Sequence, residues 1–370
     1  MLIMPIVVLF YEDNGLTPFH IFLLQAVYSI VIVGFEIPSG YFADVLGRKK
    51  TLVAGSFLGF AGYVVYSFSH GLIGFMIAEI VLGIGQSLIS GADSALLYDS
   101  LVVQKRKDEY LKLEGRVISI GNFAEAIAGI AGGLLATISY RTPYIAQSFV
   151  AFIAVPAALL LVEPQRVSSM GKMKFSDIVN IFKYALFENR PLRLNIIFSA
   201  VIGSATLTMA WFVQLYFKEI SLPVPLYGVF WTLLNLTVGL TSLVAYKIEH
   251  SLGKVKTVLM ITIFIGGCYL ALGYIQAYAG LVFLFIFYMI RGIATPVLKD
   301  YINRLTNSDI RATVLSVRNF IIRLLFAGIG PILGYLTGYY SLSFALSLAG
   351  VVFLFFGLVA LFFYKKTFSD

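Results

Sequence analysis

Ionisable side chains recur inside long apolar stretches of this sequence, where a buried helix would normally carry aliphatic residues. Placing a charge in hydrocarbon is costly, so such residues pair with one another or mark pathways for ions and solutes. The first half of the chain holds the acids and the second half the bases: Glu36, Glu79, Asp93 and Glu125, then Arg291, Arg318 and Arg323. The available chemistry is therefore proton exchange, binding of a charged group, or internal ion pairing.

Glu125 lies near the centre of the apolar stretch 114–138 and is the leading candidate for a proton-exchanging carboxyl group. A fixed ion pair with an arginine is the alternative role. Arg323 is the mirror candidate, but a guanidinium group keeps its proton, so we expect it to bind an anionic group or to pair with an acid. Arg291 offers the same two roles, and Arg318 is expected to reach the cytoplasmic interface with its long side chain.

Glu79 and three amide side chains complete the set of residues that we expect to line a cavity: Asn122, Asn319 and Gln214. Each amide lies within an apolar stretch, where it can hydrogen-bond a neighbouring helix or a solute. Residue type alone does not decide whether each amide bonds a neighbouring helix or a solute.

Residues suited to metal or nucleotide chemistry are scarce. The chain has one cysteine, Cys268. Its three histidines do not have the spacing of metal ligands: His20, His70 and His250. The phosphate-binding pattern G-x-x-x-x-G-K-[ST] does not occur, which argues against direct use of ATP. We therefore expect no cofactor, no metal and no enzyme activity, and a membrane-embedded enzyme or sensor is kept only as a further alternative.

Stretches long enough to span a bilayer dominate the chain, whose residues are 59% hydrophobic and only 12% charged. A membrane helix needs about 20 mostly apolar residues. Eleven stretches meet this length: 18–42, 51–69, 72–98, 114–138, 143–162, 194–217, 224–246, 256–274, 279–298, 312–338 and 341–363. Residues 1–10 are apolar but half as long, and we interpret them as the outer end of a truncated first span. The prediction is an all-α membrane protein.

Lysine and arginine are concentrated in every second loop between these stretches. One set of loops carries basic clusters that include Arg48, Lys105 and Arg304, whereas the alternate loops carry only Arg141 and Lys218. Basic loops face the cytoplasm, so we expect a multi-pass protein of the cell membrane with these loops inside. The net charge of +8 then reflects topology, and nucleic-acid binding is not expected.

A polar linker, 163–193, separates two halves, 1–162 and 194–370, each with six helices when the truncated one is counted. Apolar residues at helical spacing within the linker predict an amphipathic helix on the cytoplasmic membrane surface. The halves resemble each other, because LGRKKT at 46–51 matches LGKVKT at 252–257, and Asp99 matches Asp300. Repeated halves are typical of secondary transporters.

The segment GYFADVLGRKK, residues 40–50, lies between the second and third expected spans. It resembles the loop signature of the major facilitator superfamily, G-x-L-a-D-r-x-G-r-[KR]-[KR]. Phe42 replaces the usual leucine and Val45 the usual basic residue. Seven residues match this signature: Gly40, Ala43, Asp44, Gly47, Arg48, Lys49 and Lys50. The resemblance implies two six-helix bundles around a central cavity, alternating access, a monomer, and a gating loop in which Asp44 latches the cytoplasmic ends of the two halves.

A glycine-rich segment, AGIAGG at 128–133, stands where drug and proton antiporters of this superfamily carry a glycine motif with a proline, which is absent here. Ordinary small-residue packing is the alternative. This partial resemblance favours proton-coupled efflux of a small amphipathic molecule. An importer of a small organic solute, anionic in view of the arginines, is the second interpretation. The expected partners are a small-molecule substrate, protons or another coupling ion, and the lipid bilayer.

Overall fold

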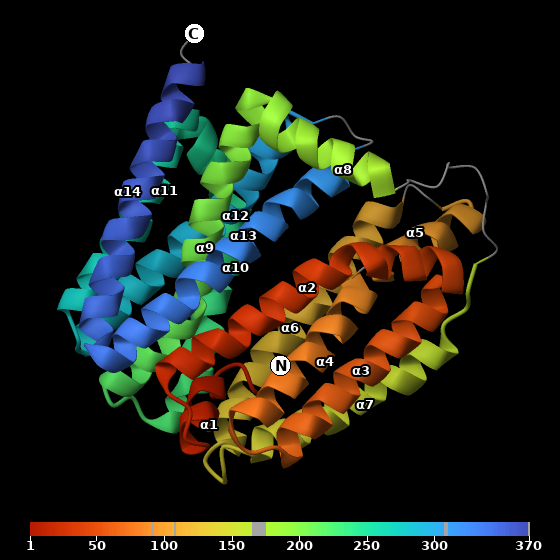
Figure 1. Cartoon of the computed structure of the whole chain (residues 1–370), viewed down its shortest axis with the longest axis horizontal. Helices are drawn as coiled ribbons and strands as arrows, with labels where there is room; N and C mark the ends of the chain where they lie inside the picture. Colours follow the sequence, from red (N-terminus) through yellow and green to blue (C-terminus); the bar gives the residue numbers. More distant parts are fainter. Residues whose placement is uncertain (91, 107–108, 165–174, 307–309, 369–370) are drawn as a thin grey trace. The chain divides into compact units, whose positions relative to one another are not determined.

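The computed structural model describes the chain apart from residues 91, 107–108, 165–174, 307–309 and 369–370 (Figure 1). It divides into two compact units. Unit 1 comprises Met1–Gly171 with Pro223–Thr232, and unit 2 comprises Lys172–Leu222 with Leu233–Asp370. Among the described residues, ten helices are long and apolar enough to cross a membrane. The all-α membrane fold expected from the sequence is confirmed.

Unit 1 contains the helices α1 (Val7–Asp13), α2 (Pro18–Leu46), α3 (Arg48–Phe68), α4 (Gly71–Ser90), α5 (Asp93–Val103), α6 (Tyr110–Leu135) and α7 (Thr142–Leu160), with the first turns of α10 (Val224–Leu252). In α6 the described apolar segment is Phe123–Leu135. The span 72–98 expected from the sequence lies within the candidate membrane span Gly71–Val103, which contains α4 and α5. Asp93 opens α5, where an acidic side chain interacts favourably with the helix dipole.

Aromatic side chains form a core in unit 1. Phe10 and Tyr11 of α1 are at most 1% exposed, as are Tyr66 of α3, Phe75 of α4 and Tyr144 of α7. The ring centres of Phe10 and Tyr144 are 4.0 Å apart, and those of Tyr66 and Phe75 are 5.4 Å apart. The short helix α1 is therefore anchored by side-chain burial against three longer helices.

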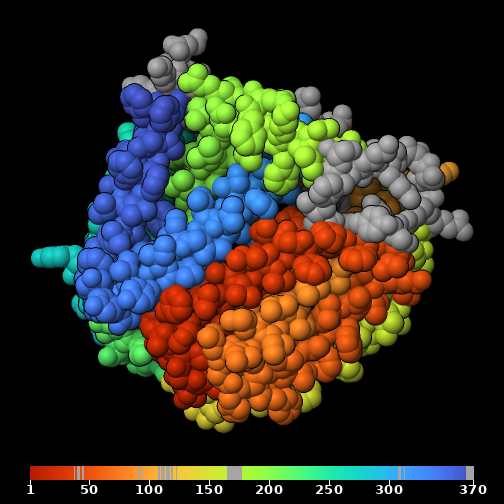
Figure 2. All heavy atoms as spheres, viewed as in Figure 1, coloured from red at the N-terminus to blue at the C-terminus, as the bar shows by residue number. Residues whose placement is uncertain are grey.

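Unit 2 contains α8 (Phe175–Lys183), α9 (Arg190–Glu219), the remainder of α10, α11 (Lys254–Tyr274), α12 (Leu281–Asn303), α13 (Arg311–Tyr339) and α14 (Leu342–Phe368). The helix α8 lies where the sequence predicted an amphipathic helix. Its buried Ile181, with Ala185 of the π-helical turn that follows, packs on Leu192, Ile302 and Val314. In Figure 2 the yellow-green atoms of α8 lie against the blue atoms of α13.

The sequence repeat has a structural counterpart at the two short links between α2 and α3 and between α10 and α11. Gly47 and Gly253 have positive φ angles of 104° and 74°, a region that favours glycine. The hydroxyl groups of Thr51 and Thr257 donate to the carbonyl oxygens of these glycines at 2.8 and 2.9 Å. The matching segments of the two halves thus adopt the same turn.

Candidate functional site

The beginning of α3 is held by a carboxylate that follows α7. Glu163 accepts hydrogen bonds from the backbone amides of Arg48, at 2.9 Å, and Lys49, at 2.6 Å. These amides belong to the first helical turn, which lacks intrahelical acceptors for them, and the helix dipole favours a negative charge there. A Cβ atom on Gly47 would lie in ordinary van der Waals contact with Glu163, at 3.4 Å, so the positive φ angle and not the carboxylate favours glycine here.

Arg48 also ties the loop to α5. Its Nη1 atom lies 2.5 Å from Asp99 Oδ2 and donates to the carbonyl oxygen of Ala95. Arg48 and Lys49 of the expected gating loop are therefore held by Glu163, in the segment after α7, and Arg48 also by α5, whereas Lys50 is exposed. This arrangement gives the loop a defined position within its own unit.

Three predicted site residues lie partly outside the described structure. Gly40 and Asp44 belong to the last turns of α2, and Asn122 belongs to α6, but the side-chain positions at these three sites are not among those described. The latch attributed to Asp44 and the cavity role of Asn122 stay predictions.

A related polar cluster occurs in unit 2, close to Gly253. The hydroxyl group of Tyr301 donates to Glu249 at 3.0 Å, and Arg304 Nη2 lies 2.6 Å from Asp300. Asp300 is the residue that the sequence repeat aligns with Asp99. In both units this aspartate is thus paired with an arginine. In unit 2 the arginine is Arg304, which lies one helical turn after Asp300, at the end of α12.

Glu79 of α4 is buried in unit 1, with 5% of its surface exposed. Its Oε1 atom accepts hydrogen bonds from the Tyr11 hydroxyl group at 3.0 Å and from Gln25 Nε2 at 2.6 Å. The Tyr66 hydroxyl group lies 2.6 Å from that of Tyr11. Tyr11 and Gln25 are 68 and 54 residues away from Glu79 in the sequence, so no local pattern could have identified these contacts.

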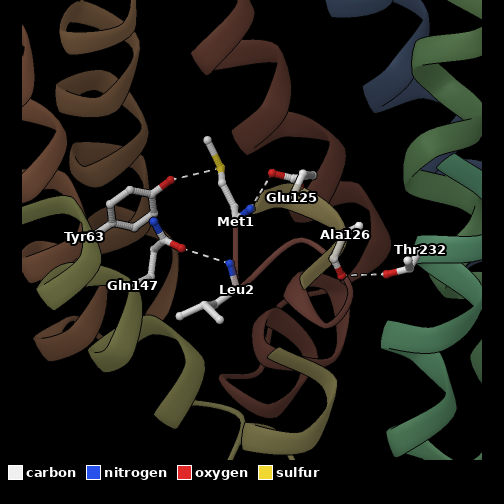
Figure 3. Close-up of polar contacts among 7 residues, drawn as sticks. All are labelled: Met1, Leu2, Tyr63, Glu125, Ala126, Gln147 and Thr232. Atoms are coloured by element: carbon white, nitrogen blue, oxygen red, sulfur yellow. Dashed lines mark hydrogen bonds and ion pairs between the residues drawn. The ribbon is translucent and has the colours of Figure 1, made fainter. Parts of the chain in front are cut away.

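Glu125 of α6 has a half-exposed side chain and forms an ion pair with the amino group of Met1 (Figure 3). Beside this pair, the Tyr63 hydroxyl group donates to Met1 Sδ at 3.2 Å, and Gln147 accepts from the Leu2 amide at 2.9 Å. Pairing of Glu125 with an arginine, the alternative considered above, stays a prediction. Proton exchange by Glu125 stays a prediction.

Small residues bring α6 and the beginning of α10 into close contact in unit 1. The Thr232 hydroxyl group donates to the Ala126 carbonyl oxygen at 3.1 Å (Figure 3). A Cβ atom on Gly129 would lie 2.7 Å from Thr232 Oγ1, and one on Gly133 would lie 3.0 Å from the Gly228 nitrogen. The glycines of the segment 128–133 therefore serve close helix packing.

Arg318 of α13 is only 6% exposed, and its guanidinium group is held inside unit 2. Its Nε atom donates to Ser199 Oγ of α9, and its Nη1 atom donates to Asn319 Oδ1 at 3.1 Å. The expectation that Arg318 extends to the membrane interface is wrong, because Ser199 supplies an acceptor in the interior. Asn319, expected in the cavity lining, contacts this arginine.

The remaining predicted cavity residues belong to three helices of unit 2. Arg291 of α12 lies with its guanidinium carbon 5.4 Å from the ring centre of Tyr288, a cation–π contact. Arg323 is partly exposed in α13, and Gln214 is fully buried in α9. Their participation in one substrate cavity stays a prediction.

Sequence reasoning missed the role of Arg141, which it used only as part of the loop-charge pattern. The guanidinium group donates to the carbonyl oxygens of Ser67 and Ser69, at 2.8 and 3.0 Å, and to Asn14 Oδ1 at 2.8 Å. It thereby joins the loop before α7 to the end of α3 and to the residue after α1. A signal was available, since Arg141 is an isolated arginine among loops with almost no basic residues.

Comparison with known proteins decides the family. Residues 1–331 match the family model described as Major Facilitator Superfamily. The chain belongs to this superfamily. It is thus a membrane transporter, as the loop signature at 40–50 suggested, and its family implies a small-molecule substrate and a lipid bilayer as partners.

Three relatives show how far sequence similarity extends. An uncharacterized major facilitator transporter of Methanocaldococcus jannaschii is 22% identical over 270 residues, 72% of this chain and 69% of the relative. An uncharacterized transporter of Buchnera aphidicola is 30% identical over 37% of this chain and 31% of its own length. The quinolone resistance protein NorA of Staphylococcus aureus is 21% identical over 47% of this chain and 44% of its own length.

Solved structures of transporters have the same fold. The nucleoside transporter NupG is similar with a TM-score of 0.82 and 14% identity, over 99% of this chain and 95% of that chain. A POT family transporter in complex with 5-aminolevulinic acid gives a TM-score of 0.75 and 15% identity, over 99% and 93% of the two chains. At such identities the likeness establishes the fold and not the substrate.

Proposed function

We propose that this transporter is a secondary exporter that exchanges protons for a small amphipathic molecule. The observation that carries the proposal is Glu125, a carboxylate within the apolar helix α6 whose side chain is 40% exposed. A carboxylate that is both within a span and accessible can meet a proton and a solute in the same space. We assign proton exchange to this residue.

The direction of transport is inferred from one relative. NorA is named for quinolone resistance, and the partial sequence match to it favours export of an amphipathic compound. The absence of a nucleotide-binding loop from the sequence favours an ion gradient as the energy source. In an alternating-access cycle, the segment 40–50 would control opening toward the cytoplasm, with Arg48 and Glu163 fixing its position in unit 1.

Proton release from everted membrane vesicles tests this function. A pH-sensitive dye would follow the response to cationic, neutral and anionic compounds in the wild type, Glu125→Gln and Glu125→Asp. We expect compound-dependent proton release by the wild type, retention of the response in Glu125→Asp, and its loss in Glu125→Gln. Transport of a compound without any proton movement would contradict the proposal. An unchanged response in Glu125→Gln would exclude Glu125 as the proton-exchanging residue.

Import of an anionic solute is a second candidate function, favoured by the burial of Arg318. Within the described part of unit 2, the hydrogen bonds of this guanidinium group go to the neutral acceptors Ser199 and Asn319. An arginine has five N–H donors, so the group retains capacity to bind a carboxylate or phosphate. Uptake of an anion that is lost in Arg318→Gln, together with no compound-dependent proton release, would favour this function over export.

A further inference from the structure

Glu79 is a buried carboxyl group at the meeting point of several helices in unit 1. Its Oε1 atom accepts hydrogen bonds from Tyr11 of α1 and Gln25 of α2, at 3.0 and 2.6 Å. Tyr66 of α3 contacts Tyr11 hydroxyl to hydroxyl at 2.6 Å. Each partner is itself buried, with at most 6% of its surface exposed. The carboxyl group is thus surrounded by donors that are themselves held in place.

The partners of Glu79 are all uncharged groups. Within the described part of the chain, its hydrogen bonds come from a phenol and an amide, and it forms no salt bridge. An arginine does lie beside the cluster, since the Arg141 guanidinium carbon is 5.3 Å from the ring centre of Phe10. Its donors, however, go to the carbonyl oxygens of Ser67 and Ser69. The described part of the chain therefore provides no fixed cation that would neutralise Glu79.

The titratable groups that surround Glu79 from the neighbouring helices are phenols of α1, α3 and α7: Tyr11, Tyr63, Tyr66 and Tyr144. Glu125, the carboxylate of the proposed function, is half-exposed, whereas Glu79 is buried. Phenols at neutral pH supply protons for hydrogen bonds without adding charge.

One hydroxyl group in this cluster has no partner. Tyr144 is 0% exposed, its ring centre lies 5.2 Å from that of Tyr66, and its hydroxyl group has no hydrogen-bond partner among the described residues. A buried hydroxyl group without a partner is unusual, because its desolvation is uncompensated. The cluster therefore has capacity for a further hydrogen-bonding species.

We propose that Glu79 is a second proton-binding carboxyl group of the transporter, loaded through the hydroxyl groups of Tyr66 and Tyr11. A hydronium ion donates a proton to the Tyr66 oxygen and leaves as water, and Tyr66 releases its own hydroxyl proton to the Tyr11 oxygen. Tyr11 then releases its own hydroxyl proton to Oε1 of Glu79. Each phenol gains one proton and loses one, so the carboxylate becomes the neutral acid and no other group changes charge. The coupling of this proton to transport rests on the proposed function.

Infrared difference spectroscopy of the purified full chain in lipid nanodiscs tests this proposal. Acidification should produce the carbonyl stretch of a protonated carboxyl group, shifted in D₂O. We expect one component of this band to be lost in Glu79→Gln, while the component that Glu125→Gln removes remains. The exposed Glu219, at the end of α9, provides the matched control, and Glu219→Gln should keep the band.

A band that Glu79→Gln leaves unchanged, or the absence of any pH-dependent carboxyl band, would overturn the proposal. Tyr11→Phe keeps the ring but removes the hydroxyl group, so it should shift the frequency of the band, and an unshifted band would exclude the relay through Tyr11. The measurement reports the protonation of the carboxyl group and does not depend on transport. Failure of this proposal is therefore distinguishable from failure of proton-coupled export.

Discussion

The hydroxyl group of Thr232 donates a 3.1 Å hydrogen bond to the carbonyl oxygen of Ala126, which holds the first turns of α10 against α6. Around this bond the backbones approach closely, because a Cβ atom on Gly228 would collide with the carbonyl oxygen of Gly129. The contact lies within unit 1, although α10 belongs to the second half of the sequence. Gly129 and Gly228 are therefore expected to be intolerant of even one added methyl group.

Substitution of these glycines should distinguish the effect of overpacking on stability from the effect of helix propensity. Gly228→Ala is expected to lower the free energy of unfolding by about 1–3 kcal/mol, because the added methyl group overpacks the contact. Gly121→Ala on α6 is the control, since a Cβ atom there meets nothing within 4 Å. Alanine is the better helix former by about 1 kcal/mol, so the control should be neutral or stabilising. Equal melting temperatures for the two variants in detergent would contradict the close contact.

The interaction of Glu163 with the beginning of α3 makes a prediction about stability. Glu163→Gln keeps one acceptor oxygen but removes the negative charge, and should cost about 1 kcal/mol of stability. Glu188→Gln is a matched control, because Glu188 is exposed and lies 3.8 Å from Lys183. The fraction of protein that stays monodisperse after heating measures the effect. If the Glu163 variant survives heating as well as the Glu188 variant does, the carboxylate does not stabilise α3.

Arg141 should not be replaceable by lysine. Its guanidinium group donates to several acceptors at once, two carbonyl oxygens at the end of α3 among them, and an ammonium group cannot reproduce that geometry. Arg141→Lys is expected to lower the free energy of unfolding by about 2 kcal/mol. Arg106→Lys is the control, because Arg106 forms an exposed ion pair with Glu109. A melting temperature unchanged from wild type in Arg141→Lys would show that charge alone suffices.

Membrane orientation can be tested with single cysteines, because Cys268 is the only cysteine of the sequence. In a Cys268→Ser background, Ser139→Cys lies in the link between α6 and α7, and Ser251→Cys lies near the end of α10. An impermeant maleimide applied to intact cells should label Ser139→Cys, and should label Ser251→Cys only after permeabilisation. The reverse pattern would overturn the cytoplasmic location of the basic loops.

Much of the fold was predictable because bilayer thickness and helix geometry constrain it strongly. The apolar stretches 18–42 and 312–338 became α2 and α13, since a span needs length and hydrophobicity more than any specific partner. The predicted span 72–98 likewise lies within the candidate span Gly71–Val103. The positive-φ glycines were identifiable from the repeat, because Gly47 and Gly253 occupy matching positions.

The site was less predictable because its contacts join residues far apart in sequence. The position of Arg318 near the cytoplasmic end of its stretch suggested snorkelling, and only the position of Ser199, 119 residues earlier, shows where the guanidinium group goes. Similarly, Glu79 stood out as an intramembrane acid, but its phenol partners could not be read from α4. Sequence alone identified the unusual residues, and packing decides what each one contacts.

The most direct test of the account is solute accumulation driven by a proton gradient in proteoliposomes that contain only this protein. An imposed pH gradient should drive accumulation of a labelled amphipathic cation in wild-type vesicles, and a protonophore should abolish it. Accumulation should also be lost in Glu125→Gln and retained in Glu125→Asp. Accumulation that persists after collapse of the pH gradient, or that is the same in Glu125→Gln as in wild type, would contradict proton-coupled export through Glu125.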